Sequence, residues 1–499
     1  MSKTPDTKLF DLIKTLSQTE KRYFKVRMKK NSDKESYQFI ELFNLIGSME
    51  HYDENELKNK LKKKGNDKHL PFRKTHLYEL VLSSLRNYHK TKSSEIEVLN
   101  LLQDIKITFD RGLFLQSEKL LEKLKKKCST YNLNQYLISA IYWEQKLIGN
   151  LKGKAFKGSS NYQTEKKIIT KVFEAQQNLL SYLKKNMELW SLRIELLDFY
   201  RFEEAGLNKP IEQFKKEVIA CINSDPPNKD HLEFTIQAHT INSMIYYFEG
   251  NYNAYVKVQK KLILLLEKEQ KFVKNNINTY ASGINNFLAA SFDADKTDEV
   301  EKWLEVLKVL LSNIDVRSNV YLSSRIFSFY QVNSLRFYNR IGNYQDAINS
   351  FSESQFNKYR FQMNPYKQFQ IRYNLVISYF YSEDFREARK WINKIINSNI
   401  EIRLNELSFI RSLSYVIHYQ LGDTSIIESL YNSKDKNTVK KLKVHKSEYV
   451  LLNGLYTMCM DPDNRKKIKN KFIDKLSEIA PKKSYDIHIL INYLRKRLK

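Results

Sequence analysis

Arg411 and His418 are the two residues of this chain whose types and spacing best fit acid–base chemistry. They stand seven positions apart within residues 408–421, a stretch whose apolar residues recur at helical intervals. Because seven positions correspond to two turns, both side chains lie on one face of the predicted helix. A histidine held beside a cationic group in this way is a candidate for general acid–base catalysis.

The Arg411-x6-His418 spacing resembles the Arg-x(4–6)-His motif of helical HEPN-type ribonucleases. The resemblance implies that the pair would activate a 2′-hydroxyl of RNA and stabilise a developing phosphorane. The alternative interpretation is structural, because His418 falls where a helical repeat places a packed aromatic residue. So short a pattern also arises by chance in basic helical proteins. We therefore expect a core histidine and no enzymatic activity.

Other residue patterns offer no further catalytic, cofactor or metal chemistry. The sequence contains no glycine-rich phosphate loop, no HExxH and no GxSxG. The remaining histidines show no metal-ligand spacing, and the three cysteines lie far apart. Three acidic pairs stand in predicted loops or at predicted helix starts, where carboxylates cap helices. These pairs are Glu203-Glu204, Asp293-x-Asp295 and Asp461-x-Asp463.

Composition indicates that helices position these residues. The chain of 499 residues has only 12 Gly and 8 Pro, too few for the tight turns of a sheet-rich fold. Apolar residues recur at helical spacing between the prolines, which predicts an all-α fold. The residues that follow Met1 include no apolar signal segment, and no long apolar run spans a membrane. With no disulfide framework, we expect a cytoplasmic protein.

A helical-hairpin pattern surrounds Gly342. The sequence reads Tyr338-x-x-x-Gly342-x-Tyr344-x-x-Ala347-x-x-x-Phe351, which resembles the second half of the tetratricopeptide (TPR) consensus. Gly can end the first helix in a left-handed conformation, the aromatic residue packs the two helices together, and Ala lets their backbones approach. The resemblance implies paired helices that stack into a superhelix.

The same pattern recurs at Gly112, Gly250, Glu383 and Gly422. The turns at 342, 383 and 422 are about 40 residues apart, and the intervals 112–250 and 250–342 divide into steps of roughly 46, which leaves room for further hairpins near 158, 204 and 296. We therefore predict a TPR-like superhelix over residues 93–432. It lies between a separate helical module at 1–92 and a basic helical cap at 433–499.

Residues 1–92 read as short helices. Ser17 with Glu20 and Asp53 with Glu56 have the spacing of capping boxes, opening helices 18–30 and 54–64. Further helices are predicted at 37–48 and 72–89. The module is either a helix-turn-helix DNA binder or a helical cap with a solvated basic face. The DNA-binding interpretation rests on the exposed lysines predicted for these helices, which are Lys21, Lys25, Lys29, Lys30, Lys58, Lys60, Lys62, Lys63 and Lys64.

The formal charge of +27 has two interpretations. It indicates either a polyanionic partner or a bias in composition with no functional meaning. The second interpretation rests on an excess of Lys, Asn, Ile and Tyr, which AT-rich coding DNA would produce. Residues 433–499 hold 18 Lys and Arg against 7 Asp and Glu. The candidate polyanion contacts are Lys440, Lys441, Lys443, Arg465, Lys466, Lys467, Lys469, Lys471, Arg495, Lys496 and Arg497.

If the repeats form a superhelix, the first helix of each pair lines a concave face that can hold an extended peptide. The leading hypothesis is a non-enzymatic adaptor that binds a protein or peptide there. The alternative is a nucleic-acid- or ribosome-associated protein that uses its basic ends. A third form joins the two hypotheses: a DNA-binding module at residues 1–92 is regulated by a peptide bound in the repeats. This layout resembles the peptide-sensing bacterial transcription regulators. The predicted groove residues are Asn333, Arg336, Asn339, Arg340, Arg372 and Asn374.

Overall fold

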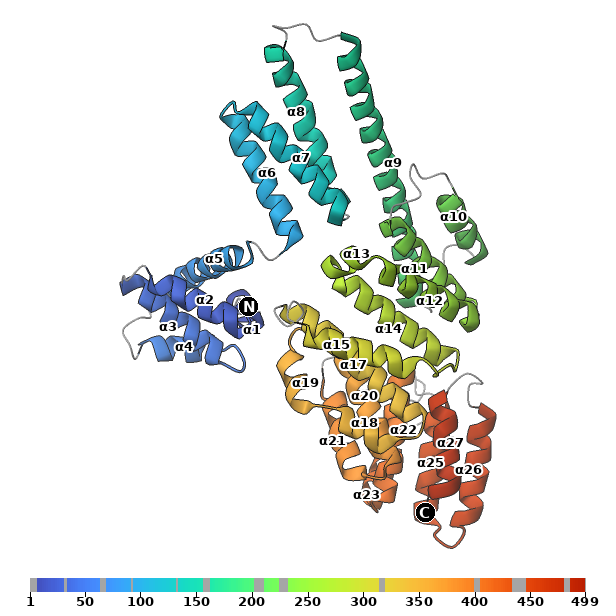
Figure 1. Ribbon diagram of the computed structural model, residues 1–499. Coiled ribbons are helices and arrows are strands. Elements are labelled where there is room, and N and C mark those ends of the chain that lie inside the picture. Colours follow the sequence, from blue (N-terminus) through green and yellow to red (C-terminus); the bar gives the residue numbers. More distant parts are fainter. Residues whose placement is uncertain are drawn as a thin grey trace. The chain divides into compact units, whose positions relative to one another are not determined.

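Every regular element that the structure describes is a helix (Figure 1), which confirms the all-α prediction for these residues. No helix in the described ranges is long and apolar enough to cross a membrane. The chain divides into two compact units, 1–296 with 318–320 and 297–317 with 321–499. The computed structural model describes residues 7–30, 34–62, 69–90, 93–131, 133–155, 162–201, 211–223, 232–313, 319–398, 404–432, 446–479 and 485–498.

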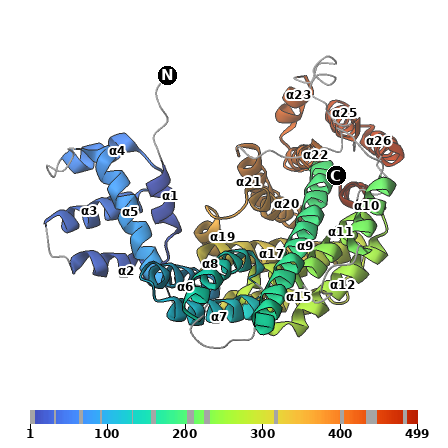
Figure 2. The same cartoon turned by 90° about the horizontal axis from the view of Figure 1, so that it is seen from above.

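The first five helices share one hydrophobic core, in which the rings of Phe24 and Phe43 stack 4.6 Å apart. Figure 2 shows α5 between α1 and α3. Ser17 and Glu20 form the predicted capping box, and Asp53 caps the fourth helix. The predicted helices are thus confirmed within a few residues. Their bounds are α1 (Lys8–Thr15), α2 (Gln18–Lys29), α3 (Lys34–Ser48), α4 (Glu54–Lys62) and α5 (Leu70–His89).

The rest of the first unit consists of longer helices. α6 packs on α7, α7 on α8, α11 on α12 and α12 on α14. The predicted turns near 158 and 204 lie outside the described residues. The bounds are α6 (Ser94–Asp110), α7 (Phe114–Tyr131), a short 3-10 turn (Asn134–Tyr136), α8 (Leu137–Ala155), α9 (Tyr162–Arg201), α10 (Ile211–Asn223), α11 (Leu232–Phe248), α12 (Tyr252–Lys268), α13 (Gln270–Asn275) and α14 (Ile277–Asp293).

In the second unit one continuous core runs from the first helices to the last. It includes Phe369, Ile410, Leu451 and Leu494, so the helices of the predicted basic cap pack with the predicted repeats. The bounds are α15 (Val300–Ser312), α17 (Val320–Arg340), α18 (Tyr344–Ser350), α19 (Glu353–Tyr359), α20 (Pro365–Tyr381), α21 (Phe385–Ile396), α22 (Leu404–Gln420), α23 (Thr424–Asn432), α25 (Lys446–Met460), α26 (Arg465–Ile479) and α27 (Tyr485–Arg497).

All five predicted turn residues, and a sixth at Asp295, end a helix with positive φ. In each case the next residue donates its N–H to a carbonyl five positions earlier. The bond from Asn343 N to Tyr338 O is 2.9 Å long, as is the bond from Asp384 N to Tyr379 O. This is the Schellman arrangement that satisfies the last carbonyls of a helix. The positive-φ residues are Gly112, Gly250, Asp295, Gly342, Glu383 and Gly422.

The residue that follows several of these turns also starts the next helix. Asn251, Asn343 and Asp384 each accept a bond from a backbone N–H three positions on, as N-caps do. At each of these turns the left-handed residue ends one helix, and the Asn or Asp that follows it opens the next. Ala347 and Ala388 are fully buried one turn later, where a small side chain lets the paired helices approach, as the sequence predicts.

Candidate functional site

Two cationic side chains converge on a buried ring between α17 and α20. Arg325 Cζ lies 5.3 Å from the centroid of the Phe329 ring, and Lys367 Nζ lies 5.7 Å from it. Arg325, Phe329 and Arg336 are spaced by four and seven positions, so they occupy one face of α17. We call Arg325, Phe329, Arg336 and Lys367 the α17–α20 cluster. Cations over an aromatic face are attracted by its negative π-density.

The cluster places positive charges close together. Burial, together with the charges of Arg336 and Arg325, lowers the pKa of Lys367 to about 8. Among the described residues no carboxylate forms an ion pair with Lys367, whereas lysines such as Lys394 and Lys390 have glutamate partners. A partly buried ammonium held near two guanidinium groups favours an anionic ligand, because an anion would offset both the burial and the repulsion.

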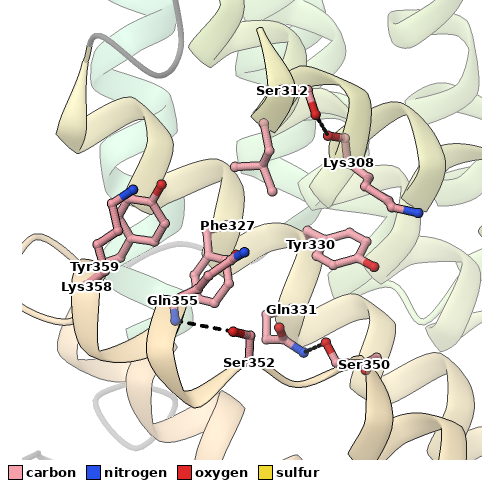
Figure 3. Close-up of a pocket in the computed structure, with 11 residues that line it drawn as sticks. Lys308, Ser312, Phe327, Tyr330, Gln331, Ser350, Ser352, Gln355, Lys358 and Tyr359 are labelled. Carbon is pink, nitrogen blue, oxygen red and sulfur yellow. Dashed lines mark hydrogen bonds between the residues drawn. The ribbon is translucent and has the colours of Figure 1, made fainter. Parts of the chain in front are cut away.

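A cavity of about 580 Å³ opens on the opposite face of α17. Figure 3 shows Phe327, Tyr330 and Gln331 of α17 facing side chains of the segment 350–359. The lining combines hydroxyl, amide and aromatic groups with two lysines and has no carboxylate. The lining residues are Lys308, Leu311, Ser312, Phe327, Tyr330, Gln331, Ser350, Ser352, Gln355, Lys358 and Tyr359.

The cavity lies where the second helix of a hairpin is interrupted. α18 ends at Ser350, and Ser352 caps α19 through its hydroxyl, which accepts from Gln355 N at 3.3 Å. The break frees the carbonyl of Ser350, and Gln331 Nε2 donates to that oxygen at 3.3 Å. Gln331 therefore donates to Ser350 O the hydrogen bond that a backbone N–H would donate in an unbroken helix.

The three predicted groove asparagines are buried and bonded within the protein. Asn339 Nδ2 donates to Asn374 O at 2.9 Å, and Ser378 Oγ donates to Asn339 Oδ1 at 2.8 Å. Asn333 Nδ2 donates to Phe329 O at 2.7 Å. With 3%, 7% and 8% of their surface exposed, Asn333, Asn339 and Asn374 satisfy buried backbone groups, and two of them join α17 to α20. A ligand on the surface does not reach these amides.

The three predicted groove arginines are separated. Arg336 belongs to the α17–α20 cluster, and Arg340 stands one turn further along α17, half-buried. Arg372 points elsewhere, because its Nη1 donates to Lys394 O at 3.3 Å and its guanidinium lies 5.8 Å from the Phe356 ring. Sequence reasoning missed Arg325, Phe329 and Lys367. The four-residue spacing of Arg325 and Phe329 is visible in the sequence. The packing of α20, which brings Lys367 to Phe329, is not.

Arg411 and His418 each have a structural partner. Arg411 binds the buried carboxylate of Glu448 on α25, and His418 Nδ1 lies 2.9 Å from Asp423 Oδ2 at the next turn. Asp423 also accepts from Arg389 at 3.3 Å. His418 is mostly buried at the position expected for a packed aromatic residue. These contacts account for both side chains without RNA chemistry.

The predicted polyanion contacts on α26 and α27 come together. Lys469 Nζ donates to Leu498 O at 2.7 Å, and Arg495 Nη2 donates to Ser477 Oγ at 3.1 Å. The end of α27 therefore lies along α26, so both basic clusters share one surface. Arg497 also approaches Glu383 at 3.7 Å. Lys440, Lys441 and Lys443 lie outside the described residues, and the exposed members are Arg465, Lys466, Lys467, Lys471, Arg495, Lys496 and Arg497.

No protein family, curated protein or solved structure matches the chain in the comparisons with known proteins.

Proposed function

We propose that this chain is a non-enzymatic adaptor of TPR-like helical hairpins, and that it binds an acidic segment of a partner protein at the α17–α20 cluster. The observation that carries the proposal is the position of Lys367, partly buried against Phe329 and near Arg325 and Arg336, with no carboxylate partner among the described residues. The repeated left-handed turns and buried alanines support the hairpin architecture.

The dimensions of the cluster favour a peptide over a small anion. Eleven residues separate Arg325 from Arg336 on α17, which corresponds to about 16 Å of helix. An extended peptide covers this distance with about five residues. Guanidinium groups bind carboxylates through two parallel hydrogen bonds, so glutamate or aspartate side chains fit the two arginines. The buried Phe329 ring lies beneath Arg325 and Lys367 and helps to hold them in place.

The test uses a fluorescein-labelled peptide of twelve alternating glutamate and leucine residues, titrated with the full-length protein by fluorescence anisotropy. We expect Lys367→Met and Arg336→Gln each to weaken binding about tenfold or more, the loss expected for a charged hydrogen bond. Lys390→Met on α21 is the matched control, because it removes one lysine charge that Glu387 already neutralises.

A peptide with glutamine in place of glutamate separates charge from apolar contact. We expect that peptide to bind weakly to the wild-type protein and to the variants alike. If Lys390→Met weakens binding as much as Lys367→Met does, the attraction is a general charge effect. The α17–α20 cluster is then not the binding site.

A second candidate function is supported by the shared basic surface of α26 and α27. Seven exposed cationic residues there come from two sequence clusters, and only Arg495 and Arg497 approach carboxylates within 4.0 Å among the described residues. Such a surface fits a polyanion, including nucleic acid or a ribosome. Replacing Lys466, Lys467 and Lys471 by glutamine tests it in the DNA titration used below for α2. A tenfold loss of affinity supports this surface, and wild-type affinity contradicts it.

A further inference from the structure

The outward face of α2 carries positive charge and one small apolar group. Positions 18, 22, 25 and 29 follow the spacing of a single helix face. Together with their neighbours they line a shallow hollow of about 340 Å³, in which half of the Val26 surface is exposed. Burial lowers the pKa of Lys21, and the charges of Lys14 and Lys25 lower it further. The lining residues are Gln18, Lys21, Arg22, Lys25, Val26 and Lys29.

The only carboxylate of α2 faces away from this surface. Glu20 Oε2 accepts from Ser17 N at 2.8 Å, and Glu20 Oε1 lies 2.7 Å from His89 Nε2. Lys21, Arg22 and Lys25 have no ion-pair partner in the part of the chain that the structure describes. Their mutual repulsion lowers the stability of the helix and is offset only when an anion binds.

Another helix in the same bundle is organised differently. On α4 the lysines follow glutamates by four positions, and Lys58 Nζ lies 3.1 Å from Glu54 Oε1 while Lys60 pairs with Glu56. A coding bias toward lysine affects both helices equally. The exposed face of α2 is nevertheless free of acids from its own helix, whereas two of the three lysines of α4 are neutralised. This contrast indicates that the charge of α2 has a use.

Packing holds α2 in a fixed orientation. Phe24 is almost fully buried against Phe43, and Met28 is buried beside it. Arg27, on the flank, donates to Ser83 O at 2.9 Å and so ties α2 to α5. The basic face is therefore presented on a rigid element, which reduces the entropy lost when a ligand binds.

We infer that the outer face of α2 binds double-stranded DNA, with the helix lying in the major groove. The twelve residues of α2 span about 18 Å, and a major groove about 12 Å wide admits an α-helix. Arg22, Lys25 and Lys29 would contact phosphates or guanine edges, and Gln18 an adenine edge. A-form RNA has a groove too narrow for a helix, and a membrane surface would need a broader apolar face than Val26 provides.

The experiment titrates the full-length protein onto a fluorescein-labelled 24-base-pair DNA duplex of mixed sequence, at 50 and 200 mM salt. The variant carries Arg22→Gln, Lys25→Gln and Lys29→Gln. The control carries Lys119→Gln, Lys123→Gln and Lys126→Gln, which removes the same charge from exposed positions of α7. Circular dichroism melting confirms that both variants fold.

We expect the α2 variant to bind DNA at least tenfold more weakly at 50 mM salt, and the α7 variant to bind like the wild type. The slope of log affinity against log salt should fall by about three in the α2 variant, roughly 0.9 for each lost phosphate contact. The inference is overturned if the wild type does not bind DNA at 50 mM salt, or if the α7 variant loses as much affinity. Tighter binding to an RNA duplex, or to phosphatidylserine vesicles, also overturns it.

Discussion

Arg411 and Glu448 form a two-point ion pair between α22 and α25. Arg411 Nε donates to Glu448 Oε1 and Arg411 Nη2 donates to Glu448 Oε2, each at 2.9 Å. Glu448 has no exposed surface, and Tyr415 OH donates a third bond to its Oε1 at 2.7 Å. Burial and the nearby Glu448 charge raise the pKa of Tyr415 well above its usual range, so it stays a donor.

The first prediction is that Arg411→Ala lowers the free energy of unfolding by about 3 kcal/mol. The change leaves a buried carboxylate without its countercharge, which costs far more than a surface ion pair. Urea denaturation measures the loss. Replacing both partners, in Arg411→Met with Glu448→Leu, should recover most of it. If Arg411→Ala unfolds at the wild-type urea concentration, the pair is not a structural link.

A variant of the second residue of the pair, His418→Ala, tests the ribonuclease hypothesis. A His418→Ala protein that keeps its wild-type melting temperature should show the same rate of cleavage of a labelled RNA as the wild type, because the imidazole is bonded to Asp423. A rate that falls by a factor of ten or more in this folded variant would restore the catalytic interpretation of Arg411 and His418.

The second prediction concerns Lys367. Lys367→Met removes a partly buried ammonium near Arg325 and Arg336 and keeps the length of the side chain. We therefore expect it to raise the free energy of unfolding by about 1 kcal/mol at pH 7, although it weakens binding of the acidic peptide. Thermal or urea denaturation measures the change. If Lys367 only stabilised the fold, Lys367→Met would lower the free energy of unfolding instead.

The stability gain of Lys367→Met should depend on pH with a defined sign. Below pH 8 the side chain of Lys367 is charged in both the folded and the unfolded protein, so the penalty is complete. Between about 8 and 10.5 the folded protein holds fewer protons than the unfolded protein, so the stability of the wild type rises with pH. The advantage of the variant should therefore shrink over this range. An advantage that grows with pH would contradict the lowered pKa.

The sequence predicts the helix ends because the chemistry of a left-handed residue is local. A helix that ends with positive φ favours glycine, so Gly112, Gly250, Gly342 and Gly422 are visible without any structure. Glu383 could be placed only by counting from its neighbours. A second local signal is the Asn or Asp that follows three of the turns and caps the next helix: Asn251, Asn343 and Asp384.

The candidate site could be predicted only in part. Arg336 was identified from its register on α17, but Lys367 lies 31 positions later and meets it only because α20 packs on α17. The repeat register placed the asparagines on the concave face. They are buried. Asn333 and Asn374 donate to carbonyls four positions earlier in their own helices, and Asn339 bonds to Asn374 O and Ser378 across the contact of α17 with α20. Such partners depend on packing, which local patterns do not encode.

The third prediction tests the left-handed turns. Glu383 has φ of 64° without the freedom of glycine, so Glu383→Gly should raise the free energy of unfolding by about 0.5–1 kcal/mol. The exposed contact with Arg497 contributes little in comparison. Glu428→Gly, in the interior of α23, is the control and should lower the free energy by about 1 kcal/mol. If both changes lower it equally, Glu383 is not strained.

The fourth prediction follows from the contact of α25 with α26, which Figure 1 shows side by side. A Cβ atom at Gly454 would lie 2.3 Å from Cγ of the buried Phe472 ring, so the helices approach only because position 454 has no side chain. Gly454→Ala should therefore lower the free energy of unfolding by about 2–3 kcal/mol, although Ala favours helices.

Gly283→Ala on α14 is the matched control for Gly454→Ala, because its Cβ would meet Leu266 Cδ1 at 3.5 Å, an ordinary contact. There the helix propensity of alanine dominates, and we expect a gain of up to about 1 kcal/mol. Combining Gly454→Ala with Phe472→Leu should cost less than the sum of the two single changes, because the smaller side chain removes the clash. Additive costs measured by urea denaturation would show that Gly454 and Phe472 do not limit the approach of α25 to α26.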